Sequence, residues 1–441
     1  MPSPHRPWSL PMTPSRRTFL TTSAALAGSV AMPSYLRAQS TPVELQVQYS
    51  IPVLFKDLME KIAADFQKAN PTIKVTLRAP EVGYEEILQR NLRDVVTNSL
   101  PDVAFHGLNR QRTLDERRIP IDLKPFMDAD PETASLGFSP SLLSLGQTGT
   151  KQTGIGFAMS TPILYYNVDL LKAAGGDPDK LPTTWDEVIR LAAAISAPAQ
   201  NRAGLFYDWT ITGNWAWQAL VMSHGGTMLN ADETRVAFAD EPGEKAIRVL
   251  RKMVDEGKMP DIRPDTAFQD FFSGRLGMSM QSTAQLGRYN REIGGRFKLV
   301  CGRFPLSAAN PRLPAGGNVA MMFTKDRARQ EAAWKFIKYA TGPIGATAMV
   351  NATGYMPGTT IPAEREDMLG KFYRDNPNHL VAIRQQDVIN GWYAFPGQNA
   401  LRITDVINDH LQSVVNKSKG ADEALKAMAA AVQPLLPRRA S

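Results

Sequence analysis

Between residues 43 and 105, stretches with the pattern of a β-strand alternate with stretches that have the pattern of an α-helix. This alternation restricts the fold more than any other feature of the chain. Val43–Tyr49 alternates apolar and polar residues, as a half-buried strand does, and Leu54–Ala69 places its apolar residues on one helical face. Ile73–Leu77, Tyr84–Val96 and Asp102–Phe105 repeat the order strand, helix, strand. The pattern predicts an α/β fold with a mostly parallel sheet and helices on both faces.

The rest of the chain continues to mix the two elements and becomes mainly helical after residue 327. The further elements that we expect are an extended run at Gly154–Tyr166, strands at Leu276–Ser282 and Val319–Thr324, and helices at Thr184–Ile195, Glu241–Glu256, Ala328–Tyr339, Pro343–Asn351, Ile403–Val415 and Glu423–Val432. With 441 residues, the chain exceeds the ~250–300 residues at which a single core stops growing. We therefore expect two lobes, and because no long linker separates them, the chain should cross between them more than once.

Residues 1–39 have the features of an export signal. Arg16 and Arg17 precede a weakly apolar stretch that is rich in small residues and is shorter than the ~20 residues that span a bilayer. The paired arginines followed by Phe-Leu are typical of a twin-arginine signal, and a Sec signal with incidental arginines is the alternative. We expect cleavage near residues 38–41 and a soluble periplasmic protein.

Charge and cysteine content exclude several classes of protein. The formal net charge is +7, but residues 1–39 contain four arginines and no acid, so the 50 basic residues less these four, against 43 acidic ones, leave about +3. No basic patch is left that would favour a nucleic-acid partner. Cys301 is the only cysteine, which excludes an intramolecular disulfide and a thiolate metal cluster. Its surroundings predict a buried strand and a structural thiol.

Sequence signatures of common enzymes are absent. The chain has no HExxH, CxxC, GxSxG or Walker A motif, so we expect no enzymatic activity, no metal and no cofactor. A secreted hydrolase is the rival class, because two carboxylates without a fixed spacing suffice for glycoside cleavage.

Two groups of aromatic residues suggest a binding surface. Five aromatic residues fall within twelve positions, and a second group surrounds Trp392; the first comprises Phe206, Tyr207, Trp209, Trp215 and Trp217. Aromatic rings stack on the C–H faces of sugars and polyols, while neighbouring hydroxyls and amides bind their hydroxyl groups. The alternative for each ring is an ordinary place in the hydrophobic core.

Three stretches of the chain resemble extracellular solute-binding proteins (family 1) of bacterial ABC importers, closest to the branch that binds glycerol 3-phosphate and carbohydrates. They are Ser160–Leu171 followed by Leu181–Glu187, Gly316–Asn318 followed by Ala332–Ile337, and Thr353–Pro357. The resemblance implies a two-lobed periplasmic binding protein fold, with a ligand cleft at a hinge and a helical C-terminal part. We expect residues 40–158 and 319–350 in the first lobe, and residues 159–318 and 351–441 in the second.

The resemblance also implies ligand contacts. Seven residues match contact positions of the glycerol 3-phosphate branch: Tyr84, Ser160, Phe206, Trp209, Ser282, Gly317 and Tyr355. His106 stands where that branch has a glutamate that accepts from glycerol hydroxyls. Asn399 lies in the region where the branch has its phosphate-binding arginine and Arg402 lies a few positions later, so that arginine has no clear equivalent. Loss of a bidentate guanidinium would remove the strongest contact to an anion.

The expected function is therefore that of a periplasmic substrate-binding component of an ABC importer. It would capture a carbohydrate, polyol or glycoside between two lobes and deliver it to the transmembrane subunits of the transporter. The alternative ligand within the same family is sn-glycerol 3-phosphate or a glycerophosphodiester. A monomer is expected.

Overall fold

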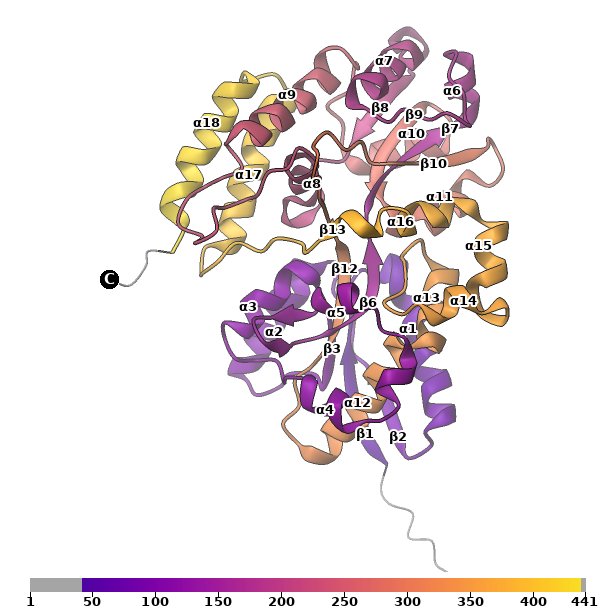
Figure 1. Ribbon diagram of the computed structural model, residues 1–441, viewed down its shortest axis with the longest axis vertical. Coiled ribbons are helices and arrows are strands. Elements are labelled where there is room, and N and C mark those ends of the chain that lie inside the picture. Colours follow the sequence, from indigo (N-terminus) through magenta and orange to yellow (C-terminus); the bar gives the residue numbers. More distant parts are fainter. Residues whose placement is uncertain (1–41, 438–441) are drawn as a thin grey trace, which may run out of the picture. The chain divides into compact units, whose positions relative to one another are not determined.

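A five-stranded sheet contains the first strands of the chain. The computed structural model describes residues 42–437, and Figure 1 labels most of their helices and strands. The strand order is β2-β1-β3-β12-β6. The bounds are β1 Val43–Gln48, β2 Ile73–Leu77, β3 Val103–Gly107, β6 Ile155–Ser160 and β12 Gly316–Met322. The expected export signal at residues 1–39 lies outside the described residues.

Only part of this sheet is parallel. β1 pairs in parallel with β2 and β3, as the βαβαβ order predicts. β12 runs antiparallel to both β3 and β6, so it is the one strand that departs from the expected parallel arrangement, and the other four strands share one direction. The reason is the place of re-entry: the chain leaves this sheet at Ser160, the end of β6, and after β11 (Leu313–Pro314) it re-enters beside that end at Gly316, so β12 runs in the opposite direction.

Helices cover both faces of the five-stranded sheet. α1 (Pro52–Ala69), α12 (Arg327–Thr341) and α13 (Pro343–Ala352) share one core with Val103 and Phe105 of β3. α2 (Tyr84–Val96) shares another core with Ala104. Because successive side chains of a strand point to opposite faces, the alternation along β3 separates the two helix layers. The helix bounds of α2 and the bounds of β2 are those expected from the sequence.

The second sheet has four strands in the order β10-β7-β9-β8. Its strands are β7 Pro162–Asn167, β8 Ala203–Tyr207, β9 Leu276–Ser282 and β10 Leu299–Arg303. Its larger helices are α7 Trp185–Ile195, α8 Trp215–Ser223, α9 Glu241–Asp255, α10 Pro264–Phe272, α11 Leu286–Ile293, α17 Ala400–Val415 and α18 Ala421–Val432. The capping box that was predicted to begin α7 is confirmed, with Thr184 and Glu187 bonding each other's backbone N–H groups.

Shorter elements connect these parts. They are β4 Gln147–Thr148, β5 Lys151–Gln152, β13 Ile389–Asn390, α3 Gln111–Asp115, α4 Lys124–Ala129, α5 Pro140–Ser144, α6 Val168–Ala173, α14 Ile361–Glu364, α15 Lys371–Asp375 and α16 Leu380–Ile383. The chain passes from the first sheet to the second at Thr161, between β6 and β7, and returns where β12 follows β11. No helix among residues 42–437 is both long enough and apolar enough to cross a membrane.

Cys301 lies in β10 and is buried, as its surrounding sequence predicts. Burial raises the pKa of its thiol well above the ordinary range, because the thiolate would lose its hydration. The thiol is therefore unreactive in the folded chain.

Candidate functional site

A cavity of about 180 Å³ receives side chains from both sheets. The structure brings five of the ten predicted site residues to its wall: Tyr84, Ser160, Ser282, Gly317 and Tyr355. Ser160 ends β6 and Ser282 ends β9, whereas Tyr84 begins α2. Ends of strands and starts of helices are the places where an α/β sheet leaves room for a ligand.

Two tyrosines provide hydroxyl groups at the cavity. Tyr84 Oη accepts a hydrogen bond from Asn318 Nδ2 over 3.2 Å, and the ring of Tyr355 stacks on Phe55 with 5.6 Å between centroids. Burial raises the pKa of both phenols, so both keep their protons at neutral pH. The two protonated hydroxyl groups also hydrogen-bond each other.

Two consecutive glycines bring the backbone of β12 close to its neighbours. Gly317 has φ +106°, in the left-handed region, and a Cβ there would overlap with the carbonyl oxygen of Ala158. A Cβ on Gly316 would lie 2.5 Å from Ser160 Oγ and 3.1 Å from the indole of Trp215. The absence of side chains at these two positions keeps the wall of the cavity open.

Asp208 is the only charged side chain among the described residues that line this cavity. It follows β8 directly and is 5% exposed. Its carboxylate accepts hydrogen bonds from Thr210 Oγ1 at 2.6 Å and from Gln281 Nε2 at 2.5 Å. Burial raises the pKa of Asp208, although these hydrogen bonds act in the opposite direction. The site therefore offers a hydrogen-bond acceptor of negative charge and no side-chain cation.

Aromatic rings complete the wall. Trp215, Trp392 and Phe268 line the cavity, and the two indole rings lie 6.2 Å apart. Trp215 Nε1 and Gln285 Oε1 are buried and have no hydrogen-bond partner within the described chain. Because buried polar atoms normally have partners, this donor and this acceptor are free to bind polar groups of a ligand.

His106 is not brought to the cavity. It is fully buried within β3, where its Nε2 lies 2.8 Å from Asn91 Oδ1, and Asn91 Nδ2 in turn donates to Gln48 Oε1 at 2.7 Å. Desolvation lowers the pKa of His106 to about 3, so the imidazole is neutral. The side chain joins α2 to the sheet and does not face the open space.

Four other predicted residues also lie away from this cavity. Phe206 and Trp209 are buried in two different hydrophobic cores on opposite faces of the four-stranded sheet. Asn399 and Arg402 are exposed at the start of α17, where Asn399 Nδ2 donates to the backbone oxygen of Leu435. Arg402 of α17 is therefore not among the residues that line the cavity.

Sequence reasoning did not select Asp208, Gln281, Trp215 or Trp392 as site residues. The aromatic groups contained both tryptophans but did not distinguish cavity rings from core rings. Asp208 had a recognisable signal, because a polar residue directly after a buried strand stands at the carboxyl end of the sheet. Gln281 lies inside β9 and had no such signal. Among the described residues, no group of three or more His, Cys, Asp or Glu could hold a metal ion.

Comparisons with known proteins agree with the resemblance. The family described as bacterial extracellular solute-binding protein matches residues 61–379. The sn-glycerol-3-phosphate-binding periplasmic protein UgpB of Salmonella typhimurium is 25% identical over 386 residues, covering 83% of this chain and 86% of the relative. The family prediction is thus confirmed.

Solved structures have the same fold. UgpB of Mycobacterium tuberculosis, in complex with glycerophosphocholine, matches with a TM-score of 0.77 and 19% identity over 90% of this chain and 98% of that one. The cyclic α-maltosyl-1,6-maltose binding protein of Arthrobacter globiformis matches with a TM-score of 0.73 and 20% identity over 89% and 99%. The predicted α/β fold of periplasmic binding proteins is therefore confirmed.

Proposed function

We infer the function from family membership: the chain belongs to the bacterial extracellular solute-binding protein family. We propose that it is the periplasmic substrate-binding component of an ABC importer. Its ligand is a neutral carbohydrate, polyol or glycoside, which it binds in the cavity between the two sheets and passes to the transmembrane subunits.

One observation carries the choice of a neutral ligand. The described residues that line the cavity combine aromatic rings, hydroxyls and amides with the carboxylate of Asp208, and they include no lysine or arginine. A carboxylate accepts hydrogen bonds from sugar hydroxyls, but it repels a phosphate. Rings of Trp215 and Trp392 suit the apolar faces of a sugar.

The two sheets form the cores of two lobes in this proposal. The expected division assigns residues 40–158 and 319–350 to the first lobe and residues 159–318 and 351–441 to the second, and we keep it except for residues 361–375. The membership of the strands in two separate sheets supports this division. Leu369 and Tyr373 pack in the core of the five-stranded sheet, so we assign α14 and α15 to the first lobe. Ligand shifts the lobes toward a closed state because it binds that state more tightly.

The site supports binding and not catalysis. Glycoside hydrolysis uses two carboxyl groups that flank the scissile bond. Asp208 is the only carboxylate among the described residues that line this cavity, so the pair is incomplete there. We therefore propose that the chain is not an enzyme.

A glycerophosphodiester is the second candidate ligand. The structural neighbour from Mycobacterium tuberculosis is described in complex with glycerophosphocholine, and several curated relatives are named for sn-glycerol 3-phosphate. Aromatic rings beside the carboxylate of Asp208 also suit a quaternary ammonium group. The phosphate of such a ligand would have to be bound by hydroxyl and backbone groups alone.

A thermal-shift screen tests the proposal. The purified protein is heated with neutral mono- and disaccharides, glycerol, glycerol 3-phosphate and glycerophosphocholine. A bound ligand at about 100 times its Kd adds about 2.7 kcal/mol to the free energy of unfolding. Stabilisation by sugars supports the proposal, whereas stabilisation by the phosphate compounds alone would replace it with the second candidate.

A further inference from the structure

A second cavity lies beside the first and shares a wall residue with it. Its volume is about 740 Å³, and Trp392 lines both cavities. Trp392 is 6% exposed, and its ring lies 6.2 Å from that of Tyr84 and 6.2 Å from that of Trp215. The indole is thus held in place by the rings of the first cavity while it also borders the second.

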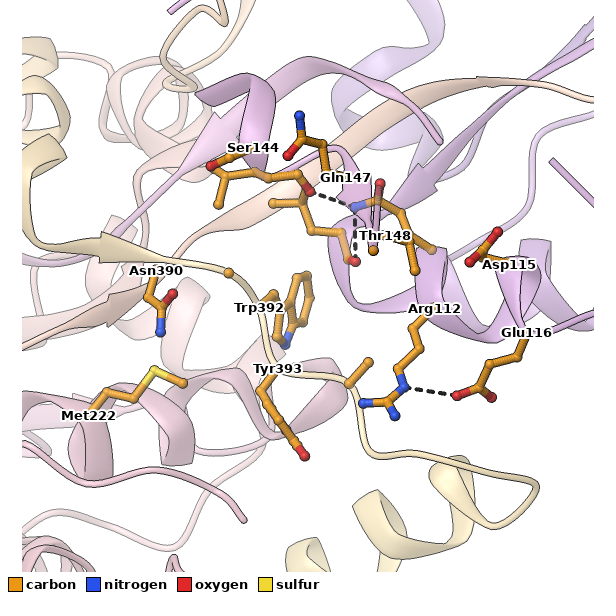
Figure 2. Close-up of a pocket in the computed structure, with 16 residues that line it drawn as sticks. Arg112, Asp115, Glu116, Ser144, Gln147, Thr148, Met222, Asn390, Trp392 and Tyr393 are labelled. Carbon is orange, nitrogen blue, oxygen red and sulfur yellow. Dashed lines mark hydrogen bonds and ion pairs between the residues drawn. The ribbon is translucent and has the colours of Figure 1, made fainter. Parts of the chain in front are cut away.

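Polar, uncharged side chains dominate one part of the second cavity. Figure 2 shows Asn390, Trp392 and Tyr393 on one segment, and Gln147 and Thr148 on another. Gln147 and Asn390 are exposed, and the amide of Gln147 donates to Gln152 Oε1 over 3.2 Å. Amides and hydroxyls beside an aromatic ring are the groups that bind a sugar.

The charges along the rest of this cavity are paired. Arg112 contacts Glu116 at 2.9 Å and Glu233 at 2.6 Å, and the carboxylate of Asp115 accepts from Lys151 at 2.9 Å. Figure 2 shows Arg112, Asp115 and Glu116 on one helical segment at the side of the cavity. Because each of these charged side chains is already paired with one of opposite charge, the wall does not favour an ionic ligand.

The two volumes differ in what they can accept. The first cavity, about 180 Å³, is below the ~300 Å³ at which typical ligand pockets begin, and the second lies well within the usual range. We propose that the second cavity binds a further sugar unit of the same ligand, so that the ligand is a disaccharide or longer glycoside with units on both sides of Trp392. This inference rests on the proposed carbohydrate function.

Calorimetric titration with matched sugars tests it. The probes are glucose, galactose and fructose beside maltose, cellobiose, lactose and sucrose. A disaccharide that binds should do so at least tenfold more tightly than the monosaccharide that it contains. Equal affinity of the two, or binding of monosaccharides alone, would overturn the inference while leaving the proposed function in place. Binding of none of these sugars would overturn the inference together with the carbohydrate part of the proposed function.

Two exposed side chains allow a test without disturbing the core. Gln147→Ala and Asn390→Ala each remove groups that line only the second of the two cavities. Each should weaken the disaccharide about fivefold, the value of one hydrogen bond, and leave the monosaccharide unchanged. Gln200→Ala is the matched control. Gln200 is exposed and precedes the start of β8, so its replacement should change the affinity for neither sugar. Equal weakening of both sugars, or no change in either, would contradict the inference.

Discussion

The two sheets contribute different chemistry to the same cavity. The five-stranded sheet and its helices supply the hydroxyls of Tyr84 and Ser160 and the bare backbone of Gly317. The four-stranded sheet supplies the carboxylate of Asp208 and the amide of Gln281. Each sheet has a buried ionisable residue in it or directly beside it. His106 lies within β3 and is enclosed by α2, whereas Asp208 follows the end of β8.

The difference shows that a buried polar side chain can be enclosed by the core or can face a cavity. His106 is bonded to Asn91, whose amide is bonded to Gln48, so its position is explained by the core. Asp208 is bonded to Thr210 and Gln281 and still faces open space. One sheet thus gives the cavity its shape, and the other gives it charge.

Replacement of the shape-forming glycine should have the largest effect. Gly317→Ala puts a Cβ against the carbonyl oxygen of Ala158 at a left-handed φ, so the free energy of unfolding should fall by about 3 kcal/mol or more. Urea unfolding measures this loss. Gly391→Ala, at a position with open space and no left-handed φ, is the control and should stay close to the parent protein. Similar stability of both variants would show that the fold does not depend on the close approach of β12 to the backbone of Ala158.

Removal of the charge should affect binding and not folding. Asp208→Asn replaces a charged acceptor, and the affinity for the best sugar of the screen should fall about 10- to 100-fold, as for loss of a charged hydrogen bond. Because burial raises the pKa of Asp208, its stabilising contribution is present at low pH and lost as the pH rises through that pKa. The Tm of the ligand-free variant at pH 7 should therefore not fall.

Calorimetry and thermal unfolding check the two halves of this prediction. Asp270→Asn, which alters a partly buried carboxylate paired with Arg275, is the control. If Asp208→Asn bound the sugar as tightly as the parent protein does, the proposed difference in chemistry between the two sheets would be contradicted.

The enclosed histidine should affect folding and not binding. The pKa of His106 is lowered to about 3 from 6.5, so as the pH falls below 6.5 the unfolded chain takes up a proton before the folded chain does. Its stabilising contribution is complete above pH 6.5 and should decrease by about 2 kcal/mol on going to pH 5. His106→Gln should lack this part of the pH dependence in urea unfolding. A change in sugar affinity at pH 7 would contradict the assignment.

The contact between Arg112 and Glu233 should have the smallest effect. The two side chains form a bidentate pair at 2.6 Å, and Tyr393 Oη also donates to Glu233. Since both are about 30% exposed, Arg112→Gln should cost about 1 kcal/mol in the free energy of unfolding, and salt should weaken the parent protein more than the variant. Thermal unfolding at low and high salt measures both. Arg365→Gln, which breaks a fully exposed pair with Asp367, is the control and should cost nothing measurable.

The local elements of the fold could be predicted because their patterns are local. The alternation of Ile73–Leu77 and the helical period of Tyr84–Val96 defined β2 and α2 to the residue. The direction of β12 could not be predicted, because it depends on a partner strand more than two hundred residues away. Strand order at such separations leaves no local periodicity in the sequence.

The candidate site could be predicted where position and resemblance agreed. Ser160, Ser282 and Gly317 lie at or near the ends of strands, so their place in the sheet brings them to the cavity. Phe206 failed to reach it because its neighbours on the second sheet cover it, a property of packing between distant helices. Packing between distant segments also places Trp392 in the walls of two cavities. Nothing in the sequence around Trp392 indicates this.

The buried thiol of Cys301 has a practical consequence. The chain contains no other cysteine, and this one is shielded by β10 and its neighbours. A cysteine introduced at an exposed position such as Gln147 would be the single site for a thiol-reactive dye. The fluorescence of that dye would report occupation of the neighbouring cavity without labelling elsewhere, which makes the protein a ready framework for an optical sensor of its own ligand.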